Sequence, residues 1–329
     1  MAKPTVFLCA RLPMGVEKFF SDRTRLEIFR GKGYISRRAL LRAVRTAKGL
    51  IPTVANLVDS KLMDAAPHLR IIANYGVGYD NIDTDAASAR GLPVTNTPCV
   101  LTETTADLAW TLVMAVARRV SEGDRLVRSG RWEGWQPTQM LGQDIHGRTL
   151  GILGMGRIGA AMARRARGFG MKILYHDIKR LSVRAERAAG MRYASLQGLL
   201  KRSNFVSVHT PLTGNTHHLI GAGALRLMKP TAILVNTSRA PVVDEKALAA
   251  ALKGGRIAAA GLDVFEREPV VESALRKLEN VVLLPHLGSA SVETRTAMGL
   301  LAAKNCLAAL AGRKPSNLVN PEAWRGRRK

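Results

Sequence analysis

The segment GILGMGRIG, residues 151–159, constrains the fold more than any other part of the chain. It contains the spacing G-x-G-x-x-G at Gly154, Gly156 and Gly159, with an apolar strand pattern before it and a helical pattern after it. In that context the first glycine permits a tight turn, the second lets the backbone approach a pyrophosphate, and the third lets the helix pack closely on the strand. The segment therefore predicts a strand–turn–helix unit that binds a dinucleotide.

The start of that helix and the end of the next strand complete the predicted phosphate site. Arg157 and Ile158 open the helix, whose unpaired N–H groups and positive dipole end attract phosphates. Asp177 ends the next strand pattern, where a carboxylate accepts hydrogen bonds from the adenosine ribose hydroxyls and repels a 2′-phosphate. We therefore expect NAD(H) to be favoured, while Lys179 and Arg180, which follow directly, leave NADP(H) open as the alternative.

Strand and helix patterns alternate along most of the chain, which predicts parallel sheets with crossover helices. Six strand patterns between residues 149 and 284 describe a doubly wound domain, and two long helical patterns, near 104–120 and 291–311, flank them. The residues after the second long helix are too few for a domain, so we expect them to fold back onto the N-terminal part. The predicted fold is α/β with two doubly wound parallel-sheet domains: a Rossmann NAD-binding domain, 100–288, inserted in a flavodoxin-like substrate domain, 1–99 and 289–329.

The charge balance is strongly basic, with 50 Lys and Arg residues against 25 Asp and Glu residues and a net charge of +25. Such a field attracts anions, including nucleic acid. However, the basic residues are spread along the chain, the dense cluster that begins at Arg325 is a tail, and no zinc-finger spacing or RNA-binding aromatic motif accompanies them. We therefore expect no nucleic-acid partner.

Cysteine usage and apolar patterning predict a cytoplasmic protein. The three cysteines, Cys9, Cys99 and Cys306, are scattered, and no pair has the spacing of metal ligands or of a disulfide framework. The apolar run near the N-terminus is too short for a signal peptide, and no stretch approaches the roughly 20 apolar residues of a membrane span. The sequence thus indicates no metal site and no membrane association.

Residues at the ends of the predicted strands offer the chemistry for reducing a 2-keto acid with a nicotinamide cofactor. That reaction needs a proton donor at the carbonyl oxygen and a cation that polarises the carbonyl. Arg239 follows one strand pattern, and its guanidinium can bond to a carbonyl oxygen and a carboxylate together. His286 follows another and can carry a proton near neutral pH, but His209 also ends a strand and is its rival.

Two further segments offer partners for this chemistry. In DVFEREP, residues 263–269, a carboxylate paired with an imidazole would favour the charged ring and fix its tautomer, and Glu268, Glu266 and Asp263 compete for that role. In NYGVGYDN, residues 74–81, the glycines can expose successive N–H groups that bind an anion, or they can form an ordinary turn.

Several blocks, in order along nearly the whole chain, resemble the D-isomer-specific 2-hydroxyacid dehydrogenases. The resemblance implies reduction of a small 2-keto acid to its D-2-hydroxy acid with NAD(P)H, and a homodimer formed through the cofactor domain. The blocks are NYGVGYDNID, LGILGMGRIG, HTPLT, VNTSRAPVVDE, AGLDVFEREP and LPHLGSA.

The same resemblance implies specific roles for residues of this chain. The catalytic trio is Arg239, Glu268 (rather than Glu266) and His286, with His286 as the proton donor. The backbone of Val77 and Gly78, together with Arg239, holds the substrate carboxylate. Besides the glycine segment and Asp177, the residues that line the cofactor are Thr105, His209, Pro211, Thr237, Asp263 and Gly288.

Within the family, the segment 49–83 resembles glyoxylate/hydroxypyruvate reductases, which makes glyoxylate or hydroxypyruvate the expected substrate. Pro52 and Thr53 depart from the family pattern in the loop that caps the substrate side chain. One alternative is therefore another D-2-hydroxyacid specificity, of the D-lactate, D-glycerate or phosphoglycerate type. The other is a cofactor-sensing binding protein like the corepressors that share this fold.

Overall fold

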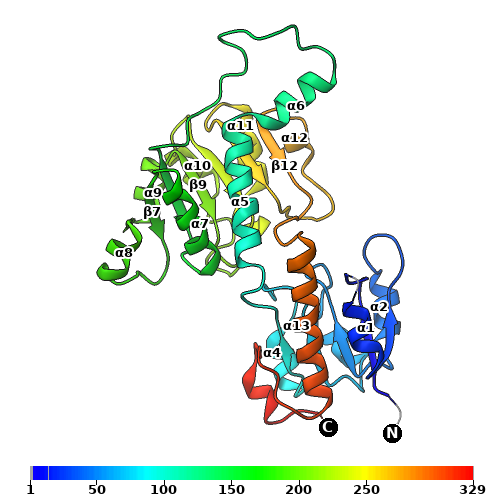
Figure 1. Cartoon of the computed structure of the whole chain (residues 1–329). Coiled ribbons are helices and arrows are strands. Elements are labelled where there is room, and N and C mark those ends of the chain that lie inside the picture. The colour runs from blue at the N-terminus through cyan, green and yellow to red at the C-terminus, as the bar shows by residue number, and fades with distance from the viewer. Residues whose placement is uncertain (1–2, 14, 329) are drawn as a thin grey trace. The chain divides into compact units, whose positions relative to one another are not determined.

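All the named strands belong to two sheets, and each sheet forms its own unit of the chain (Figure 1). The structure, a computed structural model, describes residues 3–13 and 15–328. The discontinuous unit comprises Met1–Leu101 and Ala290–Lys329, and the central unit comprises Thr102–Ser289. The first segment supplies the strands of its sheet, and the second supplies a helix that packs on that sheet, so the discontinuous unit depends on both.

In the described part of the discontinuous unit, five parallel strands are ordered β2-β1-β3-β4-β5, which is the flavodoxin-like order. Helices α1 and α13 cover one face, and α2, α3 and α4 cover the other. The strands are β1 (Thr5–Leu8), β2 (Arg25–Ile28), β3 (Gly49–Ile51), β4 (Ile71–Ala73) and β5 (Val94–Thr95), and the helices are α1 (Val16–Ser21), α2 (Arg37–Ala43), α3 (Ser60–Asp64), α4 (Thr84–Ala89), α13 (Val292–Leu310) and the 3-10 helix η2 (Pro321–Trp324).

In the described part of the central unit, seven parallel strands are ordered β12-β11-β10-β9-β6-β7-β8. This is the Rossmann order with one added strand at the β12 edge. Helices α5 and α7 pack on one face, and α9, α10 and α11 pack on the other. The strands are β6 (Thr149–Leu153), β7 (Lys172–His176), β8 (Met191–Tyr193), β9 (Phe205–Val208), β10 (Ile233–Asn236), β11 (Ala259–Leu262) and β12 (Val281–Leu283).

The helices of the central unit alternate with these strands, as crossovers between parallel strands require. They are α5 (Thr102–Ala117), α6 (Val120–Arg128), α7 (Arg157–Gly168), α8 (Val183–Ala189), α9 (Leu196–Arg202), α10 (Ala222–Leu227), η1 (Ala240–Val242), α11 (Glu245–Lys253) and α12 (Ser273–Arg276). The predicted fold class, two α/β units with doubly wound parallel sheets, is confirmed.

Three elements differ from what the sequence patterns indicate: the strands β2 and β8 and the long helix before the glycine segment. The sequence patterns predict no strand at β2 or β8, because both are short edge strands that bury little apolar surface. The long helix expected over 104–120 is divided, since Arg119 has a left-handed backbone (φ 53°) that ends α5 and starts α6.

None of the helices in residues 3–13 and 15–328 combines the length and apolarity that crossing a membrane requires.

Helix starts in both units follow from short polar side chains at the boundary. Asp59 accepts a hydrogen bond from the N–H of Leu62 at the start of α3, and Ser182 accepts one from Ala185 at the start of α8. Such caps satisfy N–H groups that have no partner within the helix. They place the helices so that their apolar faces meet the sheets.

The C-terminal residues pack closely on a glycine of the discontinuous unit, which gives a test of this packing. Gly91 has a left-handed backbone (φ 60°), and a Cβ atom there would lie 2.3 Å from the carbonyl oxygen of Gly326. Gly312 also has a left-handed backbone (φ 74°), but a Cβ atom there would meet nothing within 4 Å. We expect Gly91→Ala to lower the free energy of unfolding by about 3 kcal/mol and Gly312→Ala by about 1 kcal/mol. Urea unfolding followed by circular dichroism measures both, and equal losses would contradict the close packing.

Candidate active site

The glycine segment lies where the strand order of the central sheet reverses, between β6 and β9. Gly154 has a left-handed backbone (φ 91°), and a Cβ atom there would lie 2.7 Å from the carbonyl carbon of His209. A Cβ atom on Gly159 would lie 2.1 Å from the carbonyl oxygen of Gly154, whereas one on Gly156 would meet nothing within 4 Å. Packing therefore requires the first and third glycines, and the second borders open space at the crevice where ligands bind in such sheets.

The surroundings of this turn fit a dinucleotide. Helix α7 begins at Arg157, and the N-cap residue Gly156 provides no side-chain cap, so the first N–H groups of the helix border the open space at Gly156. The hydroxyls of Thr210 and Thr237 are buried and have no hydrogen-bond partner among the described residues. A bound ligand with polar groups would satisfy these atoms, which cost free energy when buried alone.

Asp177 supports the same turn. Its Oδ2 accepts a hydrogen bond from the N–H of Met155 (2.7 Å), and its Oδ1 accepts one from the N–H of Lys179 (3.0 Å). The side chain therefore ties the end of β7 to the glycine turn. Arg180 is directed elsewhere, since its guanidinium bonds to Glu186 (2.8 and 3.1 Å) and lies over the ring of Tyr193.

Arg239 stands in a turn that an asparagine shapes. Asn236, the last residue of β10, accepts hydrogen bonds from the N–H and hydroxyl of Ser238 (3.0 Å each) and donates one to the carbonyl of Arg239 (3.0 Å). The guanidinium of the half-buried Arg239 donates to the carbonyl of Ser238 (2.9 Å). Asn236 is not among the residues predicted from the sequence, although an asparagine at a strand end, two residues before a serine, is typical of such a turn.

His286 and Glu268 form a direct pair. Nδ1 of His286 lies 2.9 Å from Oε2 and 3.1 Å from Oε1 of Glu268, and Oε1 also accepts a hydrogen bond from the N–H of Phe265 (3.1 Å). Burial raises the pKa of Glu268, but the hydrogen bond and charge of His286, the Phe265 N–H and the charge of Arg239 outweigh it, so the pKa lies below its usual value. Glu268 is thus ionised near neutral pH and holds one nitrogen of the imidazole.

Asp263 positions the loop that carries His286. Its Oδ1 accepts a hydrogen bond from the N–H of Leu287 (2.6 Å) and its Oδ2 one from Gly288 (2.8 Å), while its carbonyl accepts one from the N–H of His286 (2.9 Å). These bonds hold His286 in a left-handed backbone conformation (φ 55°). Burial raises the pKa of Asp263 to about 6. A Cβ atom on Gly288 would lie 3.5 Å from Thr105, so Thr105, Asp263 and Gly288 lie together.

The two rivals for the acid–base pair have other partners. Glu266 lies 3.2 Å from Nε2 of His218, and its N–H donates to Glu245 (2.6 Å). His209 keeps some exposed surface, but burial of its ring lowers its pKa to about 4, and its Nε2 lies 2.8 Å from the hydroxyl of Ser207. The carboxylate hydrogen-bonded to the ring of His286 is therefore that of Glu268, while Asp263 bonds to the backbone of the same loop and Glu266 to His218.

In the discontinuous unit, Val77 and Gly78 lie in the loop after β4. Neither of their N–H groups donates a hydrogen bond to any described residue. A Cβ atom on the preceding Gly76 would lie 2.5 Å from the side chain of Val54, so only glycine fits there. Two asparagines that the sequence patterns do not single out, Asn74 and Asn96, bond to carbonyls of this loop.

Comparison with known proteins places this geometry in a family. Residues 110–288 match the family model described as D-isomer specific 2-hydroxyacid dehydrogenase, NAD binding domain. The chain is 52% identical over 326 residues to a glyoxylate reductase of Korarchaeum cryptofilum, and the match covers 97% of each protein.

Solved structures agree over the whole fold. A protein of Thermus thermophilus matches with a TM-score of 0.89 and 45% identity, covering 96% of this chain and 99% of that one. An NADPH-dependent glyoxylate/hydroxypyruvate reductase of Sinorhizobium meliloti, solved with NADP and malonate, matches with a TM-score of 0.87 and 35% identity, covering 100% of this chain and 99% of that one. The chain therefore belongs to the D-isomer-specific 2-hydroxyacid dehydrogenases.

Proposed function

We propose that the protein is a glyoxylate/hydroxypyruvate reductase, which reduces a small 2-keto acid to the D-2-hydroxy acid with a nicotinamide dinucleotide. The observation that carries this proposal is the 2.9 Å pair of His286 and Glu268 at the end of β12, in the unit whose glycine turn fits a dinucleotide. The names of the relatives in Korarchaeum and Sinorhizobium support glyoxylate or hydroxypyruvate as the substrate.

The cofactor contacts follow from the same unit. The open turn at Gly156 and the first N–H groups of α7, from Arg157 and Ile158, would bind the pyrophosphate. Asp177 would accept hydrogen bonds from the adenosine ribose. When bound, the nicotinamide ring supplies the hydride. The residues proposed to line the cofactor are Thr105, His209, Pro211, Thr237, Asp263 and Gly288.

The residues of the chain supply the binding groups and the proton. The N–H groups of Val77 and Gly78 bind the substrate carboxylate, and the guanidinium of Arg239 bonds to the carbonyl oxygen and polarises it. Glu268 holds Nδ1 of His286, so Nε2 is the nitrogen that presents a proton to the carbonyl oxygen. In the reverse direction Nε2 of the neutral ring accepts that proton. His209 is unsuited as the donor, because its pKa of about 4 leaves it neutral at neutral pH.

This assignment predicts the behaviour of a histidine variant. Wild type should oxidise NADH or NADPH with glyoxylate or hydroxypyruvate, and His286→Asn should lower turnover about a thousandfold because the proton donor is lost. Its Kd for NADH, measured by fluorescence titration, should stay within about twofold, since the phosphate site is elsewhere in the unit. Turnover is measured by loss of the absorbance of the reduced cofactor.

The matched control is His68→Asn, which changes an exposed histidine that has no assigned role in binding or catalysis and should leave turnover unchanged. Unchanged turnover in His286→Asn would contradict the role of His286. Activity with pyruvate alone would keep the mechanism but change the substrate. Binding of NADH by wild type without turnover of any 2-keto acid would favour the cofactor-sensing alternative.

We further propose that NAD(H) is preferred over NADP(H). Asp177 ends β7 with an acidic side chain, and of the two cations after it Arg180 is paired with Glu186. Lys179 is exposed and remains the competing group for a 2′-phosphate. The Sinorhizobium relative is NADPH-dependent, so the preference must be measured on this chain.

A charge-removing variant tests this preference. Asp177→Asn keeps the size of the side chain and removes the charge that repels a 2′-phosphate. Its single oxygen can still accept from one of the two N–H groups, of Met155 and Lys179, that Asp177 holds. We expect the ratio of kcat/KM for NADPH to that for NADH to rise about tenfold, as loss of one charged interaction of about 1.4 kcal/mol predicts. Asp144→Asn, an exposed acid outside this site, should leave the ratio unchanged. An unaltered ratio in Asp177→Asn would argue against a role in selectivity.

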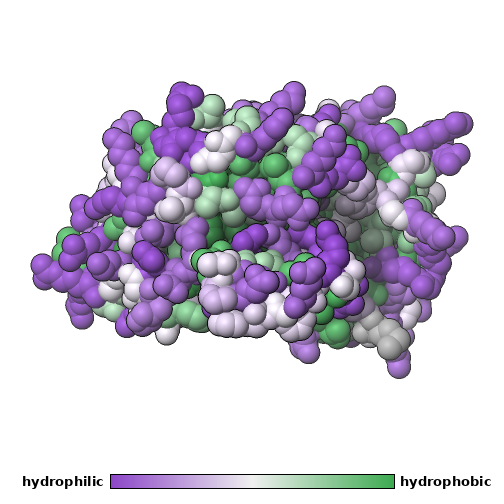
Figure 2. Space-filling view, turned by 90° about the horizontal axis from the view of Figure 1, so that it is seen from above, coloured by the Kyte–Doolittle hydropathy of each residue, from purple (hydrophilic) through white to green (hydrophobic). Residues whose placement is uncertain are grey.

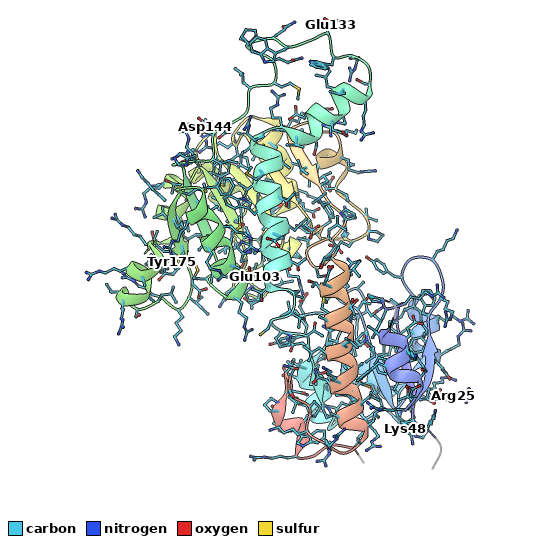
Figure 3. All side chains as sticks on the ribbon, viewed as in Figure 1. Arg25, Lys48, Glu103, Glu133, Asp144 and Tyr175 are labelled. Atoms are coloured by element: carbon cyan, nitrogen blue, oxygen red, sulfur yellow. The ribbon has the colours of Figure 1, made fainter. Side chains whose placement is uncertain are left out.

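We also propose that the protein is a homodimer formed through an arm of the central unit, residues 120–141. Figure 1 shows α6 and the loop after it projecting away from the rest of this unit, and Figure 3 places Glu133 near the tip of that loop. No described residue of α6 is buried, and Val127, Trp135 and Leu141 are 58%, 80% and 67% exposed. Figure 2, seen from above, shows hydrophobic side chains among hydrophilic ones on that face of the molecule.

The arm has a fixed base, which suits an element that holds a partner. The N–H of Gln143 donates to the carbonyl of Ala117 (2.8 Å), and its side chain donates to the carbonyl of Thr231 (2.9 Å). A Cβ atom on Gly142 would lie 2.3 Å from that same Ala117 oxygen, so the chain returns to the body at the C-terminal end of α5. A second copy would bury the apolar side chains that a lone chain exposes to water.

Removing apolar surface from the arm should weaken the dimer. We expect the double variant Trp132→Ser with Trp135→Ser to sediment as a monomer at a concentration where wild type sediments as a dimer, because aromatic side chains dominate interface energies. Val183→Ser removes a comparably exposed apolar side chain outside the arm and should remain dimeric. A monomeric wild type, or a dimer that survives both tryptophan changes, would contradict the proposal. Sedimentation velocity distinguishes these outcomes.

A further inference from the structure

The loop that carries Val77 and Gly78 has three successive carbonyl groups, each bonded to the protein. The carbonyl of Gly76 accepts a hydrogen bond from the backbone N–H of Thr97 (3.0 Å). The carbonyl of Val77 accepts one from the side-chain amide of Asn96 (2.8 Å), and that of Gly78 accepts one from Asn74 (2.7 Å). The loop is therefore held by its oxygens.

Holding these oxygens determines where the neighbouring N–H groups point. A trans peptide unit is planar, and its C=O and N–H bonds point in opposite directions. The bond from Asn96 to the Val77 carbonyl thus orients the N–H of Gly78, and the bond from Thr97 to the Gly76 carbonyl orients the N–H of Val77. Without these bonds the two glycines would leave the peptide planes free to rotate.

The two N–H groups are left available by this arrangement. Within residues 3–13 and 15–328, no acceptor receives a hydrogen bond from the N–H of Val77 or Gly78. Two adjacent N–H groups without a protein partner can bind a carboxylate or another anion. The side chain of Asn96 and the N–H of Thr97 bond to the oxygens at the opposite edges of these two peptide units, so they do not compete with that anion.

Asn96 is itself held in place. Its N–H donates to the carbonyl of Asn317 (3.3 Å), and its carbonyl accepts from the side chain of Asn305 (3.5 Å), which also bonds to the side chain of Asn317 (3.2 Å). Asn305 is 2% exposed and belongs to α13. The orientation of the Gly78 N–H therefore rests on a hydrogen-bonded series that begins in the helix covering the sheet.

We propose that Asn96 is a positioning residue for substrate binding, which aims the N–H of Gly78 at the substrate carboxylate. This inference rests on the proposed function, in which Val77 and Gly78 bind that carboxylate. Asn96 touches neither substrate nor cofactor in this role and acts only through the Val77–Gly78 peptide. It therefore controls the affinity for 2-keto acids, whereas the rate of proton transfer depends on His286.

Two variants test this role. Asn96→Ala removes the amide, and Asn96→Asp keeps its size but places an oxygen, which cannot donate, against the Val77 carbonyl. We expect each to raise the KM for glyoxylate about tenfold and to leave kcat within about threefold, as loss of one oriented hydrogen bond predicts. Calorimetry should show an equal loss of affinity for oxalate, a carboxylate probe that is not reduced, added to the complex of the protein with NADH.

The control is Asn320→Ala in the same unit. Asn320 is 3% exposed, and its side chain donates to the carbonyl of Leu92 (3.0 Å) and accepts from the N–H of Val94 (2.7 Å). It holds β5 rather than the loop, so its loss should lower thermal stability and leave KM and oxalate affinity unchanged. This separates positioning from general support of the fold.

The outcomes distinguish this inference from the proposed function. Absence of 2-keto acid reduction by wild type would contradict the proposed function. Oxalate affinity that both Asn96 variants leave unchanged, or that Asn320→Ala lowers equally, would overturn the role of Asn96. Failure of wild type to bind oxalate in the presence of NADH would overturn it as well.

Discussion

Parallel pairing requires that every strand of a sheet deliver its carboxyl end to the same edge, and nearly all the chemistry of this chain depends on that geometric constraint. In the central unit the glycine turn follows β6, Asp177 follows β7, and Arg239 and His286 follow β10 and β12. In the discontinuous unit the Val77 loop follows β4 and Asn96 follows its neighbour β5. Residues far apart in sequence thus become neighbours because their strands pair.

Two carboxylates, Asp263 and Glu268, lie in the segments that follow β11 and have different roles toward His286. Both carboxylate oxygens of Asp263 accept hydrogen bonds from backbone N–H groups, and burial raises the pKa of Asp263. Glu268, also partly buried, remains easily ionised because a histidine and an arginine offset its charge. Asp263 therefore holds the loop, and Glu268 holds the imidazole ring of His286.

The fold could be predicted from the sequence. Most strands have a high apolar content, and the spacing of the three glycines follows from the turn that they form. The edge strands β2 and β8 were not, because an edge strand buries one side at most and so lacks a continuous apolar run. The choice between Glu266 and Glu268 could not be made locally either. Both lie in one loop, and only the backbone path of that loop decides which carboxylate meets His286.

The roles of Asn74, Asn96 and Asn236 could not be predicted from the sequence for a related reason. At a strand end an asparagine is typical of any turn, and its sequence context does not reveal which carbonyl it will bond to. For Asn96 that partner is 19 residues earlier in the chain, reached only because β4 and β5 pair. Such residues are found by asking which side chains orient a peptide unit, in addition to which side chains react.

Because the discontinuous unit is formed from two separate segments of the chain, the two units can fold at different times during synthesis. Its sheet is covered on one face by α13, and residues 319 and 320 bond to β5, so residues from both ends of the sequence complete it. The central unit needs only one uninterrupted stretch. During synthesis the central unit can fold while the residues before it still wait for their covering helix, with apolar β3 and β4 left for chaperones to shield.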